Sequence, residues 1–327
     1  MQEIRGECRK LRSLLLLAAL FFLLLSIGYA ALSVYRTATD ENEAAYRILC
    51  GQYRQPVTPA LLTEASAALE GVQEQLAALS GESDDWDAQA ARQALEREAA
   101  ARERIAARMQ DMLEAGAAGE SFVYDTGWKL FFQSGYAEVL LAPCLVFLLA
   151  GVFAREREWG VWQTVCATAG RRRVRRVKCA LGLVLALGTG LLFSLSKAAF
   201  AAGMLGLPAA GMTALLPSAG WDISAGLGAA LYAAGSCGGL CALAALILFL
   251  SAGSATVFSA LVKALGLSAV SYALYQVPGR WKYIFVWWDG LLQPYPFLEY
   301  FWLTLLSCAA CTALFLIAAG SIGGKSA

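Results

Sequence analysis

Residues 14–32, LLLLAALFFLLLSIGYAAL, form an apolar run without Asp, Glu, Lys or Arg. The uncharged stretch extends from Ser13 to Tyr35 and follows a basic start at residues 1–12. The hydrocarbon core of a bilayer is about 30 Å thick, so a helix needs about 20 apolar residues to cross it. We therefore predict a membrane-spanning helix at residues 13–35. The alternative is a cleaved signal peptide, whose apolar region usually has only about 7 to 15 residues.

The rest of the chain contains further apolar runs. Hydrophobic residues make up 58% of the 327 residues and charged residues only 16%, which is too apolar for an ordinary soluble domain. We predict a second span at 135–154, and the region 179–327 is expected to hold spans three to six with short loops. Within it, residues 223–262 are uncharged and too long for one crossing, so a turn at Ser251–Ser254 would divide them into two spans. The third and last spans would cover 179–196 and 301–324.

The orientation follows from the basic residues. Four of the first 12 residues are Lys or Arg. Residues 155–178 contain eight Lys and Arg and only two Glu. Short loops rich in Lys and Arg stay in the cytoplasm. We therefore expect a multi-pass protein of the plasma membrane, with both termini and the 155–178 loop in the cytoplasm.

The segment 36–134 is acidic and is expected on the extracellular side. Apolar residues recur at spacings of three and four, which indicates an amphipathic helix; they are Leu62, Ala65, Leu69, Val72, Leu76 and Leu79. A break near 80–85 precedes a second helix with Ala101, Ile105, Met109 and Met112 on one face. The predicted fold class is therefore all-α, with six transmembrane helices and an extracellular helical hairpin between the first two.

Several chemistries are not expected. The chain has no His, so His-based triads and His-ligated zinc or haem sites are excluded. Net charge is +1, which gives no reason to expect nucleic acid as a partner. Residues 319–326, AGSIGGKS, fit a relaxed phosphate-loop pattern but lack the flanking strand and helix. Cys308 and Cys311 lie in an apolar run, where helix packing is a simpler role than redox chemistry. We expect no catalytic residue, no metal and no cofactor bound by this chain.

The segment from Phe153 to Ala180, FAREREWGVWQTVCATAGRRRVRRVKCA, combines acids, aromatic residues and a basic turn. Trp159, Trp162, Cys166 and Ala169 recur at helical spacing, which predicts a short helix with one apolar face. Such a face suits the membrane interface or the groove of a partner. The alternative is a plain topology anchor, because basic residues next to a membrane are attracted by anionic lipid.

This segment resembles the loop between the second and third spans of type-2 permeases of ATP-binding cassette transporters. The matching residues are Glu156, Glu158, Gly160, Gly170, Arg171 and Lys178. Val161 replaces a Thr of the family pattern, and a Pro before the basic turn is missing. The long insert after the first span and the approach FVYDTGW, residues 122–128, resemble a subset of these permeases from Gram-positive bacteria.

The resemblance implies a function and partners. It implies the membrane-spanning subunit of an exporter, without enzymatic activity of its own, acting as a homodimer or a heterodimer with a related permease. The matching residues, with Trp162, would form a coupling helix in a groove of a separate ATPase subunit, which would use the ATP. A different hypothesis is a non-transporting sensor or assembly factor that binds a partner through the extracellular helices. The paired intramembrane carboxylates and matching halves of an ion-coupled transporter are not found.

Three charged residues fall within or beside the predicted spans. Ionisable groups at membrane depth are costly and indicate functional or paired sites. We predict that Glu138 and Lys197, near the outer ends of spans two and three, form a pair. Lys263 would face the translocation path or a subunit interface; the alternatives are snorkelling toward the membrane surface and a misplaced span boundary. Aromatic residues before the last span predict an interfacial belt; they are Trp287, Trp288, Tyr295, Tyr300 and Trp302.

Overall fold

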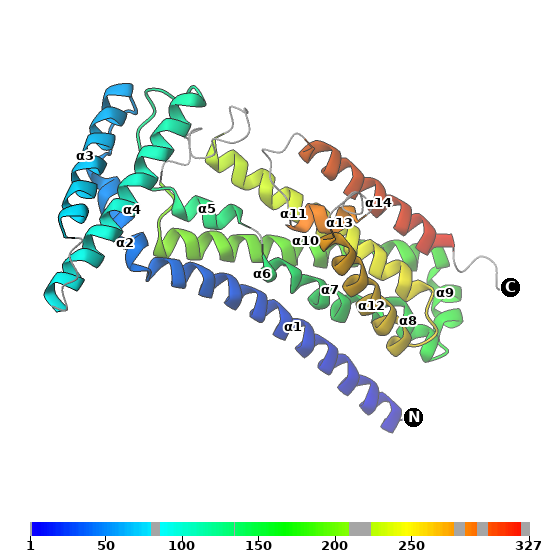
Figure 1. The fold of residues 1–327 in the computed structure, drawn as a ribbon. Coiled ribbons are helices and arrows are strands. Elements are labelled where there is room, and N and C mark those ends of the chain that lie inside the picture. The colour runs from blue at the N-terminus through cyan, green and yellow to red at the C-terminus, as the bar shows by residue number, and fades with distance from the viewer. Residues whose placement is uncertain are drawn as a thin grey trace. The chain divides into compact units, whose positions relative to one another are not determined.

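The computed structural model describes residues 2–79, 86–133, 135–208, 224–277, 285–292 and 300–321, without the side chains of 2–12, 165–166, 168–169, 171 and 320–321. Every named element in these ranges is an α-helix (Figure 1), which confirms the all-α class. The helices are α1 (Gln2–Ala38), α2 (Glu41–Gln52), α3 (Pro59–Ala78), α4 (Trp86–Glu114), α5 (Thr126–Phe132), α6 (Tyr136–Val139), α7 (Leu141–Leu149), α8 (Gly151–Glu158), α9 (Trp162–Ala169), α10 (Arg171–Met204), α11 (Ala225–Ala252), α12 (Val257–Gln276), α13 (Val286–Leu292) and α14 (Phe301–Ser321).

Five helices in the described ranges are long and apolar enough to cross a membrane. They are Ser13–Ala38, Arg172–Met204, Ala225–Ala252, Val257–Gln276 and Phe301–Ala319. A sixth span exists if the bent pair Thr126–Val139 and Leu141–Glu158 crosses as one. The chain therefore has the helices of a membrane protein, and the predicted second span is the one that is interrupted.

The interruption of the second span has a local cause. Pro143 lies in the first turn of α7, where its missing N–H is tolerated. A continuous helix would place the proline ring against the carbonyl of Val139, four residues earlier. The helix breaks at Leu140, directly after that carbonyl.

The third span begins earlier than the apolar run. Its helix, α10, starts at Arg171, so the basic turn that was expected to belong to a loop forms its first turns. Gly170 has φ +76 and separates α9 from α10. Arginine has a high helix propensity, so the basic residues after this glycine continue the helix of the span.

The predicted hairpin of residues 223–262 is confirmed as two helices, α11 and α12. The helix α11 continues through Ser251 and Ala252, and the connection lies two residues later than expected. The hydroxyl of Thr256 accepts a hydrogen bond from the N–H of Ser259 at 3.2 Å and caps α12. An N-cap threonine satisfies one of the free N–H groups of the first turn.

The chain divides into two compact units, which are described separately. Unit 1 consists of Met1–Ala30, Gln133–Lys197 and Ala230–Ala327, and unit 2 of Ala31–Phe132 and Ala198–Ala229. The core of unit 1 is built mainly from α7 and α11. Fully buried members include Leu145, Leu149, Leu240, Leu243 and Leu248. Most of α7 is buried, with residues on all its faces contributing to this core.

The helix α13 lies within unit 1 and corrects the predicted aromatic belt. Trp287 and Trp288 are 7% and 1% exposed, and the indole N–H of Trp288 donates to the hydroxyl of Ser271 at 2.8 Å. These two residues pack in the core of the unit and do not form part of an outer belt. Tyr300 and Trp302 are exposed, whereas Tyr295 lies outside the described residues.

Unit 2 is a helical body in which α4 packs against both α2 and α3. The predicted face of α4 is buried: Ala101, Ile105, Met109 and Met112 are all core residues. On α3, the predicted stripe is buried or half-buried up to Leu76, while Leu79 is exposed. The helix α2, which was not predicted, completes the core with Tyr46 and Leu49.

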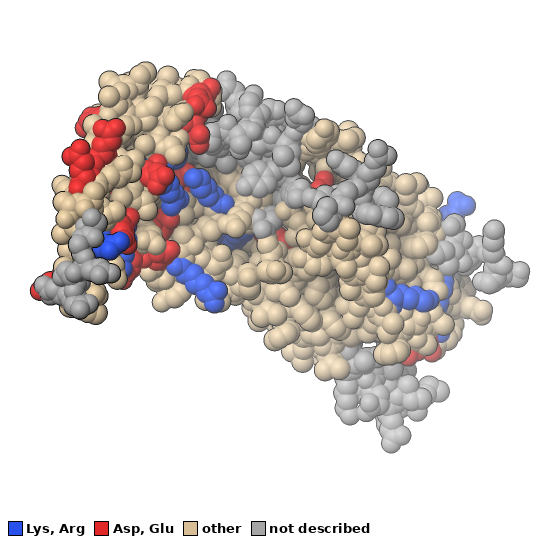
Figure 2. Space-filling view, viewed as in Figure 1, with Lys and Arg blue, Asp and Glu red and all other residues tan. Residues whose placement is uncertain are grey.

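Charge is unevenly distributed along the chain. Residues 36–132 contain 17 Asp and Glu against nine Lys and Arg. On the face drawn in Figure 2, the acidic residues gather over α3 and α4, and the surface of α11, α12 and α14 is almost free of charge. This separation is the one expected for a chain with one solvated and one membrane-embedded part.

Candidate functional site

The segment that carried the functional prediction folds as two short helices and the start of a third. The helix α8 ends at Glu158, α9 covers Trp162–Ala169, and α10 begins at Arg171. Gly160 and Gly170 have φ +68 and +76, a backbone conformation that side chains with a Cβ rarely adopt. The two glycines therefore set the turns on either side of α9.

Lys178 joins the start of α10 to α8. Its ammonium group forms a salt bridge with Glu156 at 2.7 Å and donates to the carbonyl of Val152 at 2.7 Å. The Glu156 and Lys178 side chains are 23% and 16% exposed. Because both are largely shielded from water, the pair orients the two helices more strongly than an exposed ion pair would.

Glu158 and Ser251 fix α8 against the start of α12 and the end of α11. A carboxylate oxygen of Glu158 accepts the N–H of Val257, in the first turn of α12, at 3.0 Å. A negative charge is favourable at this end of a helix. The hydroxyl of Ser251 accepts from the N–H groups of Phe153 and Ala154 at 3.0 and 3.2 Å and donates to the carbonyl of Ala150 at 2.7 Å.

Trp162 lies inside a cluster of cations and does not point away from the protein. Its ring packs edge to face on Phe153, with the centroids 6.1 Å apart. The charged groups of Arg157, Arg175 and Lys178 lie 5.8, 5.9 and 5.8 Å from its centroid. Cations attract the face of an indole ring, so Trp162 is a packing centre for the segment.

The predicted continuous apolar face is interrupted. Trp159 precedes α9 and terminates α8, because Gly160 turns the chain between the two tryptophans. The side chains of Cys166, Ala169 and Arg171 lie outside the described residues. Trp159 is 45% and Val161 40% exposed, and Gln163 and Ala167 on α9 are exposed as well. This group, Trp159, Val161, Gln163 and Ala167, is called the α9 surface below.

The predicted pair of Glu138 and Lys197 is confirmed. Their charged groups are 2.7 Å apart, and the side chains are only 2% and 7% exposed. The Lys197 ammonium group also donates to the carbonyl of Gln133 at 2.6 Å and to the hydroxyl of Tyr232 at 3.2 Å. Glu138 accepts the N–H of Gly135 at 2.7 Å through its other oxygen. The pair joins α6, α10 and α11 within unit 1.

Lys263 is exposed on α12, and its ammonium group lies 3.5 Å from the hydroxyl of Ser254. Ser254 belongs to the connection between α11 and α12. The lysine side chain therefore extends back along α12 toward that connection. This direction is the one expected when a lysine snorkels toward the end of its helix.

Asp289 is a charged residue of unit 1 that the sequence analysis missed. It lies on α13, accepts from the hydroxyl of Thr304 at 2.8 Å and from that of Tyr275 at 3.4 Å. Asp289 is the one Asp, Glu, Lys or Arg among residues 283–298. An ionisable group in such an apolar run needs a partner, so the sequence signal that identifies Glu138 also identifies Asp289.

The sequence analysis also missed a buried ion network in unit 2. Asp125 is 1% exposed and lies 3.2 Å from Arg108 and 2.8 Å from Lys129, and it accepts from the hydroxyl of Tyr46 at 3.1 Å. Burial raises the pKa of this carboxyl, but Arg108 and Lys129 outweigh it, so the pKa lies below its ordinary value.

A second ion pair continues this network. Arg104 pairs with Glu43 at 2.8 Å and donates to the hydroxyl of Thr126 at 2.9 Å, and Thr126 in turn donates to Glu43. Asp125 and Thr126 belong to the FVYDTGW motif. The network shows what this motif does in the fold: it supplies the partners for charges on α2 and α4.

Among the described residues, no three or more Cys, Asp or Glu side chains are grouped so that they could hold a metal ion. No family model, curated protein or solved structure matches this chain. Its function therefore has to be inferred from the arrangement of its own residues.

Proposed function

We propose that this chain is the membrane-spanning permease subunit of an ATP-driven exporter, as the resemblance of residues 153–180 to type-2 permeases of ATP-binding cassette transporters suggests. The observation that supports it most is the α9 surface. Trp159 and Val161 are exposed beside the short helix α9, which lies between two glycine turns. Trp162 packs α9 on Phe153 of α8, and Glu156, Glu158 and Lys178 join α8 to α10 and α12.

Such an arrangement can transmit movement. The acids and Lys178 hold internal contacts, so they are not free to bind a partner. A partner that pushed on the α9 surface would instead move α8, α10 and α12 together through these contacts. This is the property that coupling between an ATPase and a bundle of spans requires.

The proposed topology places residues 1–12, the segment 155–178 and the C-terminus in the cytoplasm, and 36–134 outside the cell. The acidic composition of residues 36–132 and the basic residues near α9 support this orientation. We further propose that two permease chains, identical or related, form the translocation path. The ATPase subunit would bind and hydrolyse the ATP.

The test is co-purification with the ATP-binding cassette ATPase encoded beside this chain. Val161→Arg and Ala167→Arg place a bulky charge on the α9 surface without touching the Glu156–Lys178 pair. We expect each to reduce ATPase binding at least about tenfold, the effect of about 1.4 kcal/mol, and to reduce ATP turnover in the complex. Leu79→Arg, at an exposed leucine of unit 2, is the matched control and should leave both unchanged.

If the unmodified chain binds no ATPase, the permease assignment is wrong. The alternative of a sensor or assembly factor, which binds its partner through unit 2, would then be preferred. If the chain binds the ATPase and both α9 variants bind it equally well, the subunit assignment stands and the proposed docking surface is wrong.

A further inference from the structure

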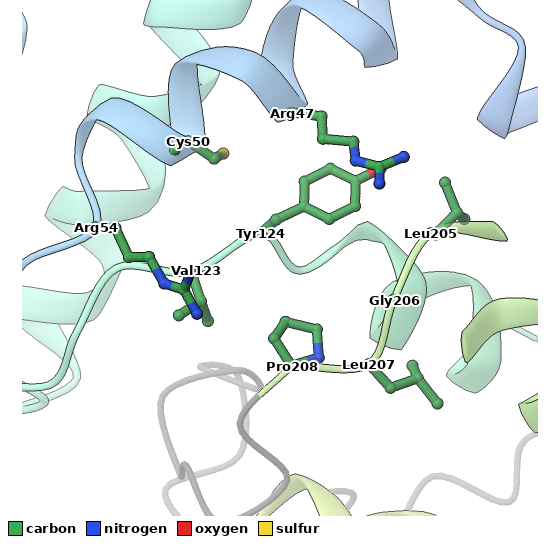
Figure 3. Close-up of a pocket in the computed structure, with 10 residues that line it drawn as sticks. Arg47, Cys50, Arg54, Val123, Tyr124, Leu205, Gly206, Leu207 and Pro208 are labelled. Atoms are coloured by element: carbon green, nitrogen blue, oxygen red, sulfur yellow. The ribbon is translucent and has the colours of Figure 1, made fainter. Parts of the chain in front are cut away.

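Unit 2 contains a cavity of about 370 Å³ that has no part in the proposed coupling (Figure 3). Three segments line it: the C-terminal half of α2 with Arg54 beyond its end, the residues Val123 and Tyr124, and the residues that follow α10. The lining residues are Arg47, Cys50, Gly51, Arg54, Val123, Tyr124, Leu205, Gly206, Leu207 and Pro208. A volume of this size holds a headgroup and the first part of an apolar chain, but not a whole lipid.

The segment after α10 is fixed in place. The indole N–H of Trp128 donates to the carbonyl of Pro208 at 2.9 Å. Gly127 faces the carbonyl of Gly206 so closely that a methyl group on Gly127 would overlap it, and Gly206 itself has φ +86. These contacts hold the wall of residues 205–208 against α5, so the cavity is built by the fold.

Two guanidinium groups line this cavity. Arg47 lies over the ring of Tyr124, 5.9 Å from its centroid, and donates to the carbonyl of Met204 at 3.4 Å. Figure 3 shows Arg47 and Arg54 on different sides of Tyr124, with Leu205 to Pro208 along another wall. Within the described part of the chain, neither arginine forms an ion pair with a carboxylate.

The arginines of α4 behave differently. Each of them pairs with an acid of unit 2; they are Arg92, Arg97, Arg102, Arg104 and Arg108. Acids outnumber bases in this part of the chain, so partners for Arg47 and Arg54 are not scarce. The two guanidinium groups at the cavity therefore have free capacity for an anion from outside the chain.

The remaining walls are largely apolar. Leu205, Leu207 and Pro208 directly follow the membrane-length helix that ends at Met204, and Val123 adds to this surface. We propose that the cavity binds an amphiphile with a terminal phosphate group. The phosphate binds at the guanidinium groups that line the cavity, Arg47 and Arg54, whose planar donor groups match phosphate oxygens, and the apolar part follows Leu205 to Pro208. The inference does not depend on the ATPase.

The experiment uses the full chain purified in an uncharged detergent. Three probes are titrated by calorimetry: dihexanoyl phosphatidic acid, dihexanoyl phosphatidylcholine and inorganic phosphate. We expect the phosphatidic acid to bind at least about tenfold more tightly than either of the others. The phosphatidylcholine would lose a charged hydrogen bond and inorganic phosphate would lose the apolar contact, and either loss weakens binding about tenfold. Arg47→Gln and Arg54→Gln should each weaken its binding about tenfold.

The matched control is Arg92→Gln, which removes an exposed guanidinium from α4 and should leave affinity within twofold. Leu207→Gln should weaken the binding of phosphatidic acid and leave the affinity for inorganic phosphate unchanged. Equal affinity for all three probes would overturn the proposal, and so would unchanged binding by both cavity variants. If inorganic phosphate binds as tightly as the phosphatidic acid, the apolar part of the ligand contributes nothing, and the proposal that the ligand is an amphiphile is wrong. These outcomes are independent of whether the ATPase co-purifies.

Discussion

Asp125 shows how single residues stabilise unit 2. Its carboxylate is almost completely buried and is neutralised by Arg108 and Lys129. Arg108 is only 6% exposed and also donates to the hydroxyl of Tyr46 and the carbonyl of Val123. When one partner of a buried pair is removed, the other charge remains without compensation.

We therefore predict that Asp125→Asn destabilises unit 2 by about 3 kcal/mol, because Arg108 stays buried without its counter-charge. Hydrogen exchange of α4 peptides in the purified chain measures the change. Asp111→Asn makes the same chemical change at an exposed position of α4 and should stay within about 0.5 kcal/mol. Equal protection in the two variants would mean that the Asp125 network contributes little to stability.

The same residue predicts a pH dependence. The pKa of Asp125 in the folded protein lies below the ordinary value of 3.8. Folding therefore favours its ionised form, and this stabilisation is complete above about pH 3.8 and is lost as the pH falls through the folded-state pKa. Below about pH 3.8, the melting temperature of the unmodified chain should fall more steeply with decreasing pH than that of Asp125→Asn. If the melting temperatures of the two proteins depend on pH in the same way, Asp125 is not the group whose ionisation stabilises the fold.

Cys50 illustrates a further consequence of burial at residue scale. It is 3% exposed, and burial raises the pKa of its thiol to about 11. At neutral pH the thiol is protonated, and the thiolate is the reactive form. Cys50 is therefore a free cysteine that is shielded from reagents in solution.

Some of these residues were predictable from the sequence and others were not. Glu138 and Lys197 stood out because charges are rare in apolar runs, and each needed a partner. Asp125 lies in a segment with many charges, so nothing in the sequence distinguished it as buried. Trp162 had the right spacing for an exposed face, but the sequence does not reveal the turn at Gly160 that directs it inward.

At the scale of elements, unit 1 depends on a close approach of α11 and α13. A methyl group on Gly239 would lie 2.7 Å from the backbone of Trp287 and Leu291. Backbone atoms at that distance cannot move away without shifting α13. Gly266 on α12, in contrast, has no atom within 4 Å of the same methyl position.

We predict opposite effects of alanine at these two glycines. Gly239→Ala should lower the melting temperature of the purified chain, since a steric clash costs about 1 to 3 kcal/mol. Gly266→Ala should leave it unchanged or raise it, because alanine favours a helix over glycine by about 1 kcal/mol. Equal melting temperatures would show that α13 does not pack on α11 at Gly239.

The Glu138–Lys197 pair can be tested by exchanging its charges. Glu138→Lys and Lys197→Glu each place two like charges in a buried site, so each should reduce the yield of folded protein and its melting temperature. The double variant should recover part of both losses. Recovery is partial because the exchanged pair cannot reproduce the bonds to Gly135 and Tyr232. Additive losses would contradict a direct interaction.

The sequence predicted the presence of the membrane-length helices better than the residues at which they begin and end. The apolar runs located the membrane-length helices, since length and composition are sufficient for that purpose. They did not locate the break at Leu140, which depends on Pro143, or the start of α10 among arginines. The helix α2 was missed because one of its buried residues is the acid Glu43, whose partner Arg104 lies far away in sequence.

At the scale of the whole molecule, the account is that of a permease subunit whose two units have different solvents. Unit 1 contains most of the apolar helices, and the 36–132 region of unit 2 carries the acidic excess. The α9 surface and Leu79 are exposed apolar positions that should lie on opposite sides of the membrane. Because the proposed topology puts them on opposite sides of the membrane, docking and topology can be tested together.

The most direct measurement is site-specific photo-cross-linking in cells that express the neighbouring ATPase. A benzophenone amino acid is introduced at position 161 in one variant and at position 79 in the other. The account predicts a covalent adduct with the ATPase from position 161 and none from position 79. An adduct from position 79, or none from position 161 while the subunits co-purify, would contradict it.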